Sequence, residues 1–318
     1  MAEVETRNEK RAAGATTPTQ QEMLGKIVEY SFWMLKQGYA ESTIENRRGF
    51  MKTLMKRGTN LFDPESVKEV IAKQKTWSNN TKSTVVDAYN KFAMLNNLTW
   101  VPPVYHKTES LPFIPLESEV DQLVAGCGKK VAAYLQTLKE TAMRPGEAWR
   151  LKWVDIDSER RLISLNKPEK NSNPRMWKVS EKLMVMLNRL PKKSEYVFAT
   201  KCQRAFKQNF RAQRKRIARK LVNPRIIQIT MYTLRHWKAT MLYHQTKDIL
   251  YVMKFLGHKN IKNTLLYVTI DSTIFGLEDN DEFTVKVAET LKEACELLEA
   301  GFKYVTDMNG KKIFRKRK

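Results

Sequence analysis

Hydrophobic residues recur at three- and four-residue steps along much of this chain, which is the pattern of amphipathic helices. The first such run consists of Met23, Ile27, Tyr30 and Met34, and Gly38 follows it as a stop signal. The polar stretch before it, residues 1–20, has no such pattern. We therefore expect a flexible lead over 1–20 and a helix after it.

Three more helical runs follow within the next 60 residues. Ser42 and Glu45 have the spacing of a capping box, which predicts a helix start at Ser42. Asp63 followed by Pro64 predicts an N-cap and a first-turn proline, and the last run begins near residue 80. These four helices predict a small all-α domain over residues 21–97.

Prolines interrupt the helical pattern after residue 97 and divide the chain. The prolines are Pro102, Pro103, Pro112 and Pro115. They predict a stiff, extended linker over residues 98–115. The second domain is expected to begin at residue 116.

Residues 116–275 combine helical patterns with a short block of strand-like sequence. Three short strands are predicted, around Trp153, Ile163 and Trp177, and a polar turn over 166–174 joins the last two. The predicted fold class is therefore α+β, mainly helical with a small sheet.

The remaining residues, 276–318, are expected to form a C-terminal helix, a hairpin and a basic tail. Residues 282–298 carry an apolar face at helical spacing. Asn309 and Gly310 lie between short apolar alternations, which predicts a hairpin over 302–314. The basic tail is residues 315–318.

The net charge of +23 and the pI near 9.8 point to a polyanionic partner. Ten Lys/Arg and no acid lie within residues 201–225, where a partial apolar stripe predicts a basic helix with one face in the core. No apolar run reaches the ~20 residues of a membrane span. Three widely spaced cysteines fit reduced thiols, so we expect a cytoplasmic, nucleoid-associated protein with no membrane partner.

Three motifs carry candidate chemistry. They are Arg144-Pro-Gly-Glu147, Tyr232-Thr-Leu-Arg235-His236, and Leu256-Gly257-His258 with Tyr267 nine residues later. In this order they resemble the tyrosine site-specific recombinases, or integrases, and their wording is most similar to archaeal virus and plasmid integrases. The resemblance covers residues 116–275, and it implies a helical core-DNA-binding domain before them.

The resemblance implies a covalent reaction on DNA without metal or cofactor. Arg144 and Arg235 would clamp the scissile phosphate, and Tyr267 would attack it to form a 3′-phosphotyrosine. Two planar, permanently charged guanidiniums suit the charge of a pentacovalent phosphorus. His258 would donate to the phosphate, and Glu147 would hold Arg144 or an adjacent backbone group. No His, Cys or carboxylate cluster in the sequence has metal-ligand spacing.

Two positions leave alternatives open. The family has a lysine general acid in the turn between two strands, and Lys170 fits this role better than the runner-up Lys167. The family's usual histidine, three residues before the second arginine, is Tyr232 here. A tyrosine is a poor base near neutrality because its ordinary pKa is ~10. We expect His236, next to Arg235 but about 100° away on a helix, to have no base role.

Further basic and polar side chains are candidate DNA contacts in the first domain and in the basic helix. They are Ser42, Thr43, Arg47, Arg48, Lys82, Arg204, Lys207, Arg211, Arg214 and Lys215. The resemblance also implies a C-shaped clamp on duplex DNA, a homotetramer on two duplexes, and contact between protomers through the C-terminal helix.

The sequence thus favours a recombinase that integrates or excises a mobile element. The alternatives are a chromosome-dimer-resolving recombinase, a type IB topoisomerase-like enzyme, and a catalytically impaired DNA-binding or architectural protein.

Overall fold

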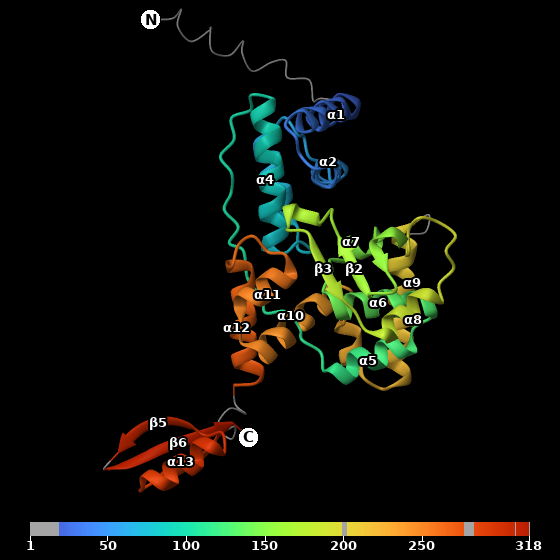
Figure 1. The fold of residues 1–318 in the computed structure, drawn as a ribbon. Helices are drawn as coiled ribbons and strands as arrows, with labels where there is room; N and C mark the ends of the chain where they lie inside the picture. The colour runs from blue at the N-terminus through green and yellow to red at the C-terminus, as the bar shows by residue number, and fades with distance from the viewer. Residues whose placement is uncertain (1–18, 199–201, 277–282, 309, 318) are drawn as a thin grey trace, which may run out of the picture. The chain divides into compact units, whose positions relative to one another are not determined.

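A computed structural model describes residues 19–198, 202–276, 283–308 and 310–317 (Figure 1). The chain divides into two compact units, Met1–Ser110 and Leu111–Lys318. Most of the lead expected over 1–20, and the last residue of the basic tail, lie outside the described residues. No helix among the described residues is long and apolar enough to cross a membrane.

The first unit is helical. Its helices are α1 (Gln20–Lys36), α2 (Glu41–Lys56), α3 (Pro64–Lys73) and α4 (Asn79–Leu95). Ile27, Tyr30 and Met34, which the spacing assigns to one face of α1, are all buried. The Tyr30 hydroxyl donates to the carbonyl oxygen of Ala88 in α4 at 2.8 Å, so the core of this unit also satisfies its buried polar atom.

The helix starts of this unit agree with the sequence in one case and differ in another. The side chain of Asp63 accepts from the backbone N–H of Glu65 and caps α3, with Pro64 in the first turn. The expected capping box of Ser42 and Glu45 is wrong, because α2 begins at Glu41 and its N-cap residue is Ala40. Ser42 is therefore the second residue of α2 and not its N-cap, so Ser42 and Glu45 do not form a capping box.

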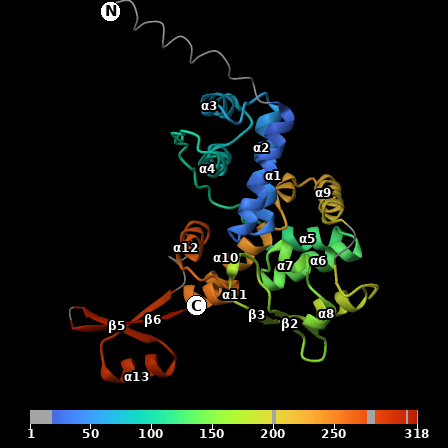
Figure 2. The ribbon, with the colours of Figure 1, turned by 90° about the horizontal axis from the view of Figure 1, so that it is seen from above.

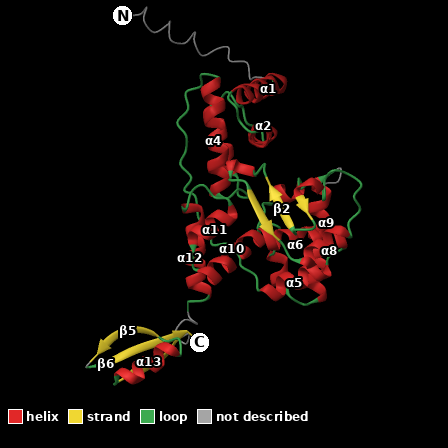
Figure 3. Cartoon of the chain, in the orientation of Figure 1, coloured by secondary structure: helices red, strands yellow, loops and turns green. Residues whose placement is uncertain are grey.

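The second unit contains the small sheet and most of the helices (Figures 1 and 3). Its elements up to residue 276 are α5 (Glu117–Gly126), α6 (Lys129–Thr141), α7 (Pro145–Trp149), η3 (Trp153–Asp155), β1 (Ile156–Asp157), β2 (Leu162–Leu165), η4 (Glu169–Asn171), β3 (Arg175–Lys178), α8 (Glu181–Asn188), α9 (Gln203–Lys220), η5 (Pro224–Gln228), α10 (Thr233–Thr246), α11 (Ile249–Leu256) and α12 (Lys262–Ile274).

The sheet is antiparallel with strand order β1-β2-β3, and Ile163 pairs with Trp177 across β2 and β3. Ile163 and Trp177 are buried in the same core as Leu135 and Leu138 of α6. The strand expected around Trp153 is a 3₁₀ turn, η3, and the strand β1 follows it at Ile156.

The basic helix is α9. Its apolar stripe, Phe206, Phe210 and Ile217, is buried, whereas Leu221 follows the helix and is 41% exposed. The stripe attaches the helix to the core, so the charged positions between its members remain on the outer side.

The C-terminal segment differs from the expected long helix. Its elements are β4 (Phe283–Ala288), α13 (Leu291–Glu299), β5 (Lys303–Met308) and β6 (Lys311–Arg317). Residues 283–288 therefore form a strand, and the helix has nine residues. Alternating residues such as Val285 and Val287 satisfy a strand pattern as well as a helix pattern, and pairing of β4 with β6 decides between them.

Replacement of Asp63 by Ala tests the cap of α3. Asp63→Ala should lower the free energy of unfolding by about 1 kcal/mol, because it removes the acceptor of the Glu65 N–H. Asp63→Asn, which keeps an acceptor oxygen, is the matched control and should lose much less in chemical denaturation. Equal losses for the two variants would contradict the cap.

Candidate active site

A cavity of about 260 Å³ in the second unit collects most of the residues singled out in the motifs. Its lining consists of Arg144, Lys170, Tyr232, Arg235, His236, His258, Asn263, Leu266 and Tyr267. They come from the start of α7, the turn η4, helices α10 and α12, and the residue pair after α11. The three motifs therefore meet at one place.

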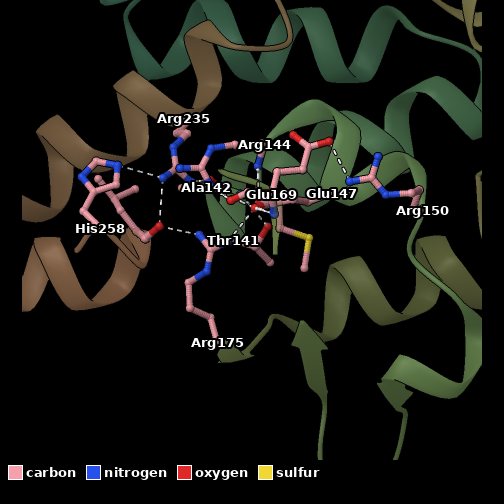
Figure 4. A network of polar contacts seen from close by, with 11 residues as sticks. Thr141, Ala142, Arg144, Glu147, Arg150, Glu169, Arg175, Arg235 and His258 are labelled. Carbon is pink, nitrogen blue, oxygen red and sulfur yellow. Dashed lines mark hydrogen bonds and ion pairs between the residues drawn. The ribbon is translucent and has the colours of Figure 1, made fainter. Parts of the chain in front are cut away.

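Glu147 organises the first motif (Figure 4). Its carboxylate accepts from the backbone N–H of Arg144 at 2.8 Å and from the Arg144 guanidinium at 2.9 Å. It also accepts from the backbone N–H of Glu169 at 3.1 Å. One buried side chain therefore caps α7, orients Arg144 and fixes the turn η4.

Arg175 is a further member of this network. In the sequence it follows Lys170 at a basic position of the family's return strand, and the motifs gave it no role in the site. Its guanidinium is buried and donates to Glu147 at 2.8 Å and to the carbonyl oxygen of Leu256. Burial alone raises the pKa of Glu147, but Arg175 and Arg144 outweigh it and hold the pKa below its usual range. Glu147 is thus ionised and paired with two arginines.

The turn η4 presents Lys170 to the cavity in an uncommon backbone conformation. Lys170 and Asn171 have φ values of 57° and 52°, a region that side chains other than glycine seldom adopt. Such conformations cluster at functional sites because the surrounding structure must hold them. Lys167, the alternative, lines a different cavity together with Lys152 and Tyr196.

Arg235 is held by the ends of two helices. Its guanidinium donates to the carbonyl oxygen of Ala142 at 2.6 Å and to that of Leu256 at 2.9 Å. Ala142 caps the C-terminus of α6 and Leu256 ends α11, so each carbonyl lies at the negative end of a helix dipole. This arrangement compensates a guanidinium that is only 2% exposed.

The geometry at Gly257 explains why the Leu-Gly-His motif has a glycine at its centre. Gly257 caps α11 with φ 70°, and a Cβ there would lie 2.8 Å from the Arg175 side chain. Glycine allows both the turn and the close approach of Arg175. The motif thus supplies the Leu256 carbonyl to two arginines and places His258 beside Arg235.

His258 is a neutral acceptor in this arrangement. Its Nε2 lies 3.0 Å from an Arg235 nitrogen, which can only donate, and its Nδ1 lies 3.0 Å from the Thr264 hydroxyl. Burial, together with the nearby arginines, lowers the pKa of His258 to about 4. A bound anion would offset that repulsion and favour the protonated form.

Tyr267 is buried in α12, and its hydroxyl oxygen lies 3.2 Å from Nδ1 of His236. Burial raises the pKa of the Tyr267 phenol to about 12, although Arg235 acts in the opposite direction. Burial and the charge of Arg235 also lower the pKa of His236. At neutral pH a protonated phenol therefore faces an unprotonated imidazole.

This contact places His236 in the site beside Tyr267, although the sequence analysis expected it to have no base role. Residues 232 and 236 are one helical step of four apart, so they share a face of α10. Tyr232 occupies the family's histidine position, and His236 lies four residues later on the same face of the helix. This spacing was the signal in the sequence that could have placed His236 in the site. Tyr232 is 41% exposed, and its ring centre lies 5.3 Å from that of His236.

Positive charge exceeds negative charge in this buried network. The guanidiniums of Arg144, Arg175 and Arg235 are buried, and the buried carboxylate of Glu147 pairs with only the first two. Burial and the two neighbouring arginines lower the pKa of Arg235 to about 10, so it stays charged at neutral pH. The cavity therefore favours an anionic guest.

The predicted DNA contacts lie in two places. On α9, Arg204, Lys207, Arg211 and Lys215 are exposed, whereas Arg214 donates to the carbonyl oxygen of Ile229 at 2.6 Å. Arg214 thus helps to hold η5 against α9.

In the first unit, Ser42 and Arg48 on α2 are exposed, and Thr43 is half-buried beside them. Arg47 is 4.9 Å from the centre of the Tyr39 ring. Lys82 donates to the carbonyl oxygen of Ala72 at 3.0 Å.

Comparison with known proteins connects this geometry to a family. The sequence model of the phage integrase family matches residues 116–273. A search of curated proteins found no match.

Several solved structures share the fold. The Tn1549 transposon integrase in complex with transposon right end DNA is similar with a TM-score of 0.58 and 17% identity, over 80% of this chain and 98% of that one. A lambda integrase dimer bound to a core site has a TM-score of 0.56 and 14% identity, over 76% and 94% of the two chains. The XerH site-specific recombinase bound to its difH substrate has a TM-score of 0.53 and 18% identity, over 84% and 97%.

The family match covers all three motifs, and the structural matches share the mostly helical fold with small antiparallel sheets. The chain therefore carries a phage integrase family domain over residues 116–273, and it is a tyrosine recombinase, an enzyme that transfers DNA strands.

Proposed function

We propose that this chain is a site-specific integrase that inserts or excises a mobile element, using Tyr267 as its nucleophile. The observation that carries the proposal is the convergence of Tyr267, Lys170 and two buried arginines on one small cavity with excess positive charge. A phosphodiester is the anion that such a cavity would receive on duplex DNA.

The reaction follows from the positions of the side chains. The Tyr267 oxygen attacks phosphorus while its proton passes to Nδ1 of His236. The bond from phosphorus to the 5′-oxygen breaks, and Lys170 protonates the leaving oxygen. A 3′-phosphotyrosine remains, and the reverse steps rejoin a new 5′-end.

The arginines and His258 would stabilise the negative charge that develops on the non-bridging oxygens. Arg144 and Arg235 would donate to these oxygens, and preorganised donors in a dry site stabilise such charge without reorganising. Glu147 and Arg175 would position them, because they contact the arginine or its carbonyl partner and do not line the cavity. Tyr232 would donate its hydroxyl to a phosphate oxygen.

Strand exchange between two duplexes would require a tetramer. The residues of the motifs and the fold shared with the Tn1549 transposon integrase support a role in moving a mobile element, such as an archaeal virus or plasmid. The fold shared with XerH keeps a chromosome-dimer-resolving role as the second candidate. Mapping of the cleaved sites in the DNA that flanks the reading frame would separate the two.

Tyr267→Phe should abolish strand cleavage but leave DNA affinity nearly unchanged, because one hydroxyl adds little to a surface dominated by phosphate contacts. The measurement is the yield of covalent protein–DNA adduct on a nicked suicide half-site, beside a binding titration. Binding by the unaltered protein with no adduct would instead favour a catalytically impaired DNA-binding protein. An adduct formed by Tyr267→Phe would assign the nucleophile elsewhere.

Lys170→Ala should cleave an ordinary half-site slowly and recover on a half-site whose leaving 5′-oxygen is replaced by sulfur, because a thiolate leaves without a general acid. The matched control is Lys167→Ala, from the same turn, which should cleave the ordinary half-site normally. Recovery by sulfur in the Lys167 variant would move the general acid to that residue.

His236→Asn should lower the cleavage rate by about 10² or more, because Asn accepts a hydrogen bond at the place of Nδ1 but takes up no proton. Tyr232→Phe is the comparison: it removes a phosphate donor but no base, so its pH profile should keep the acid limb. The unaltered protein should lose activity on acidification through the lowered pKa of His236, since protonated imidazole cannot accept the phenol proton. His236→Asn should lack this acid limb, and an unchanged profile would refute the assignment.

A further inference from the structure

The C-terminal segment builds a second basic surface that the catalytic chemistry does not use. Its strands form an antiparallel sheet in the order β4-β6-β5, and α13 packs against one side of it (Figure 2). Ala288, Ala294, Phe302 and Phe314 are buried between sheet and helix. The residues described on the opposite side are exposed or partly exposed, and we call this side the open face.

The strand register identifies the residues of the open face. Val285 pairs with Arg315, Val287 with Ile313, and Lys303 with Arg315, and directly paired residues of antiparallel strands share a face. Val285 and Val287 are 58% and 50% exposed, in contrast to the buried Ala288 and Phe314.

Lys311, two residues before Ile313 on β6, lies on this same face and forms an ion pair with Glu289 at the end of β4.

Charge is separated between the two layers of this segment. The three strands contain seven Lys/Arg and one acid, Asp307. Helix α13 contains three glutamates and one lysine, Lys292. By the strand register, Lys286, Lys312 and Lys316 share the side of Ala288 and Phe314, which α13 covers. Lys303, Lys311 and Arg315 lie on the open face, where Glu289 pairs with Lys311. The open face therefore keeps an excess of positive charge, which favours a polyanion.

The dimensions of the open face fit duplex DNA. Three strands at ~4.8 Å spacing span about 10 Å, and the major groove is ~12 Å wide and admits β-structure. Lys303 on the edge strand β5, and Lys311 and Arg315 on the central strand β6, would reach phosphates. The valine methyl groups on the other edge strand, β4, would contact base edges or thymine methyl groups. We infer that the open face is a second binding surface for duplex DNA, separate from the catalytic cavity.

Self-association explains the face less well. Two copies meeting through it would oppose Lys303, Lys311 and Arg315 with the same charges, and like charges placed together are unfavourable. Among the side chains that the structure describes, the apolar part consists of two half-exposed valines and a partly buried isoleucine. DNA accounts for both the charge and the limited apolar area.

The test uses the full chain with two open-face lysines neutralised, Lys303→Gln/Lys311→Gln. Each phosphate contact contributes ~0.9 to the slope of log affinity against log salt for duplex DNA. The double variant should lower this slope by about 1–2 on a long duplex. Lys292→Glu, on α13, changes the net charge equally and should keep the slope, since a glutamate in the first helical turn is also tolerated.

A second measurement on the unaltered protein does not depend on the variants folding. Duplex DNA should protect Lys303 and Lys311, but not Lys292, from a lysine-modifying reagent. Equal slopes, or absence of protection, would overturn the proposal. The proposal would also be overturned if light scattering showed that the double variant no longer self-associates while its salt slope is unchanged. That result would assign the open face to contact between two copies of the protein.

Failure of this proposal is distinct from failure of the proposed function. At saturating protein, the double variant should still form the covalent adduct on a suicide half-site, because the open face holds DNA and takes no part in cleavage. An adduct yield that falls with the double variant even at saturation would contradict a separate surface.

Discussion

The site depends on one buried carboxylate. Glu147 is 1% exposed and accepts hydrogen bonds from the Arg144 guanidinium, the Arg175 guanidinium and the backbone of Glu169. Removing one partner of a buried ion pair leaves an uncompensated charge, so each of these groups depends on the carboxylate. The start of α7, the position of β3 and the turn that presents Lys170 are thereby set by the same side chain.

The carboxylate does not balance the charge of the site, and this imbalance links structure to function. Carbonyl oxygens of Ala142 and Leu256 at two helix ends hold Arg235, but they carry only partial charge. The pKa values of Arg235, His258 and His236 are all lowered, with burial as the largest cause and arginine repulsion next. Each of these shifts means that the cavity resists further positive charge, and a phosphate would relieve that repulsion.

Much of the architecture follows from local patterns in the sequence. Helical periodicity and the Asp63 cap give the helices of the first unit, and the polar turn over 166–174 gives the hairpin that carries Lys170. The order and spacing of the three motifs resemble those of a known family, and this resemblance predicted that Arg144, Arg235 and Tyr267 lie close together. Contacts between distant elements could not be predicted in this way.

Three differences show why. Arg175 contacts Glu147 and Leu256, which are 28 and 81 residues away, and no short-range pattern reports such a pairing. The contact of His236 with Tyr267 depends on how α12 packs against α10, through Asp271, His244 and Lys247. Residues 283–288 form a strand because β6 pairs with them, although their spacing also suits a helix.

The central claim is that Tyr267 forms the covalent bond to DNA. Its most direct test is mass spectrometry of the trapped adduct after digestion with trypsin, because the peptide from Asn263 to Lys286 contains Tyr267 as its only tyrosine. The account predicts that this peptide carries a nucleotide joined through a 3′-phosphate to Tyr267. A nucleotide on another peptide, or one joined through a 5′-phosphate, would contradict it.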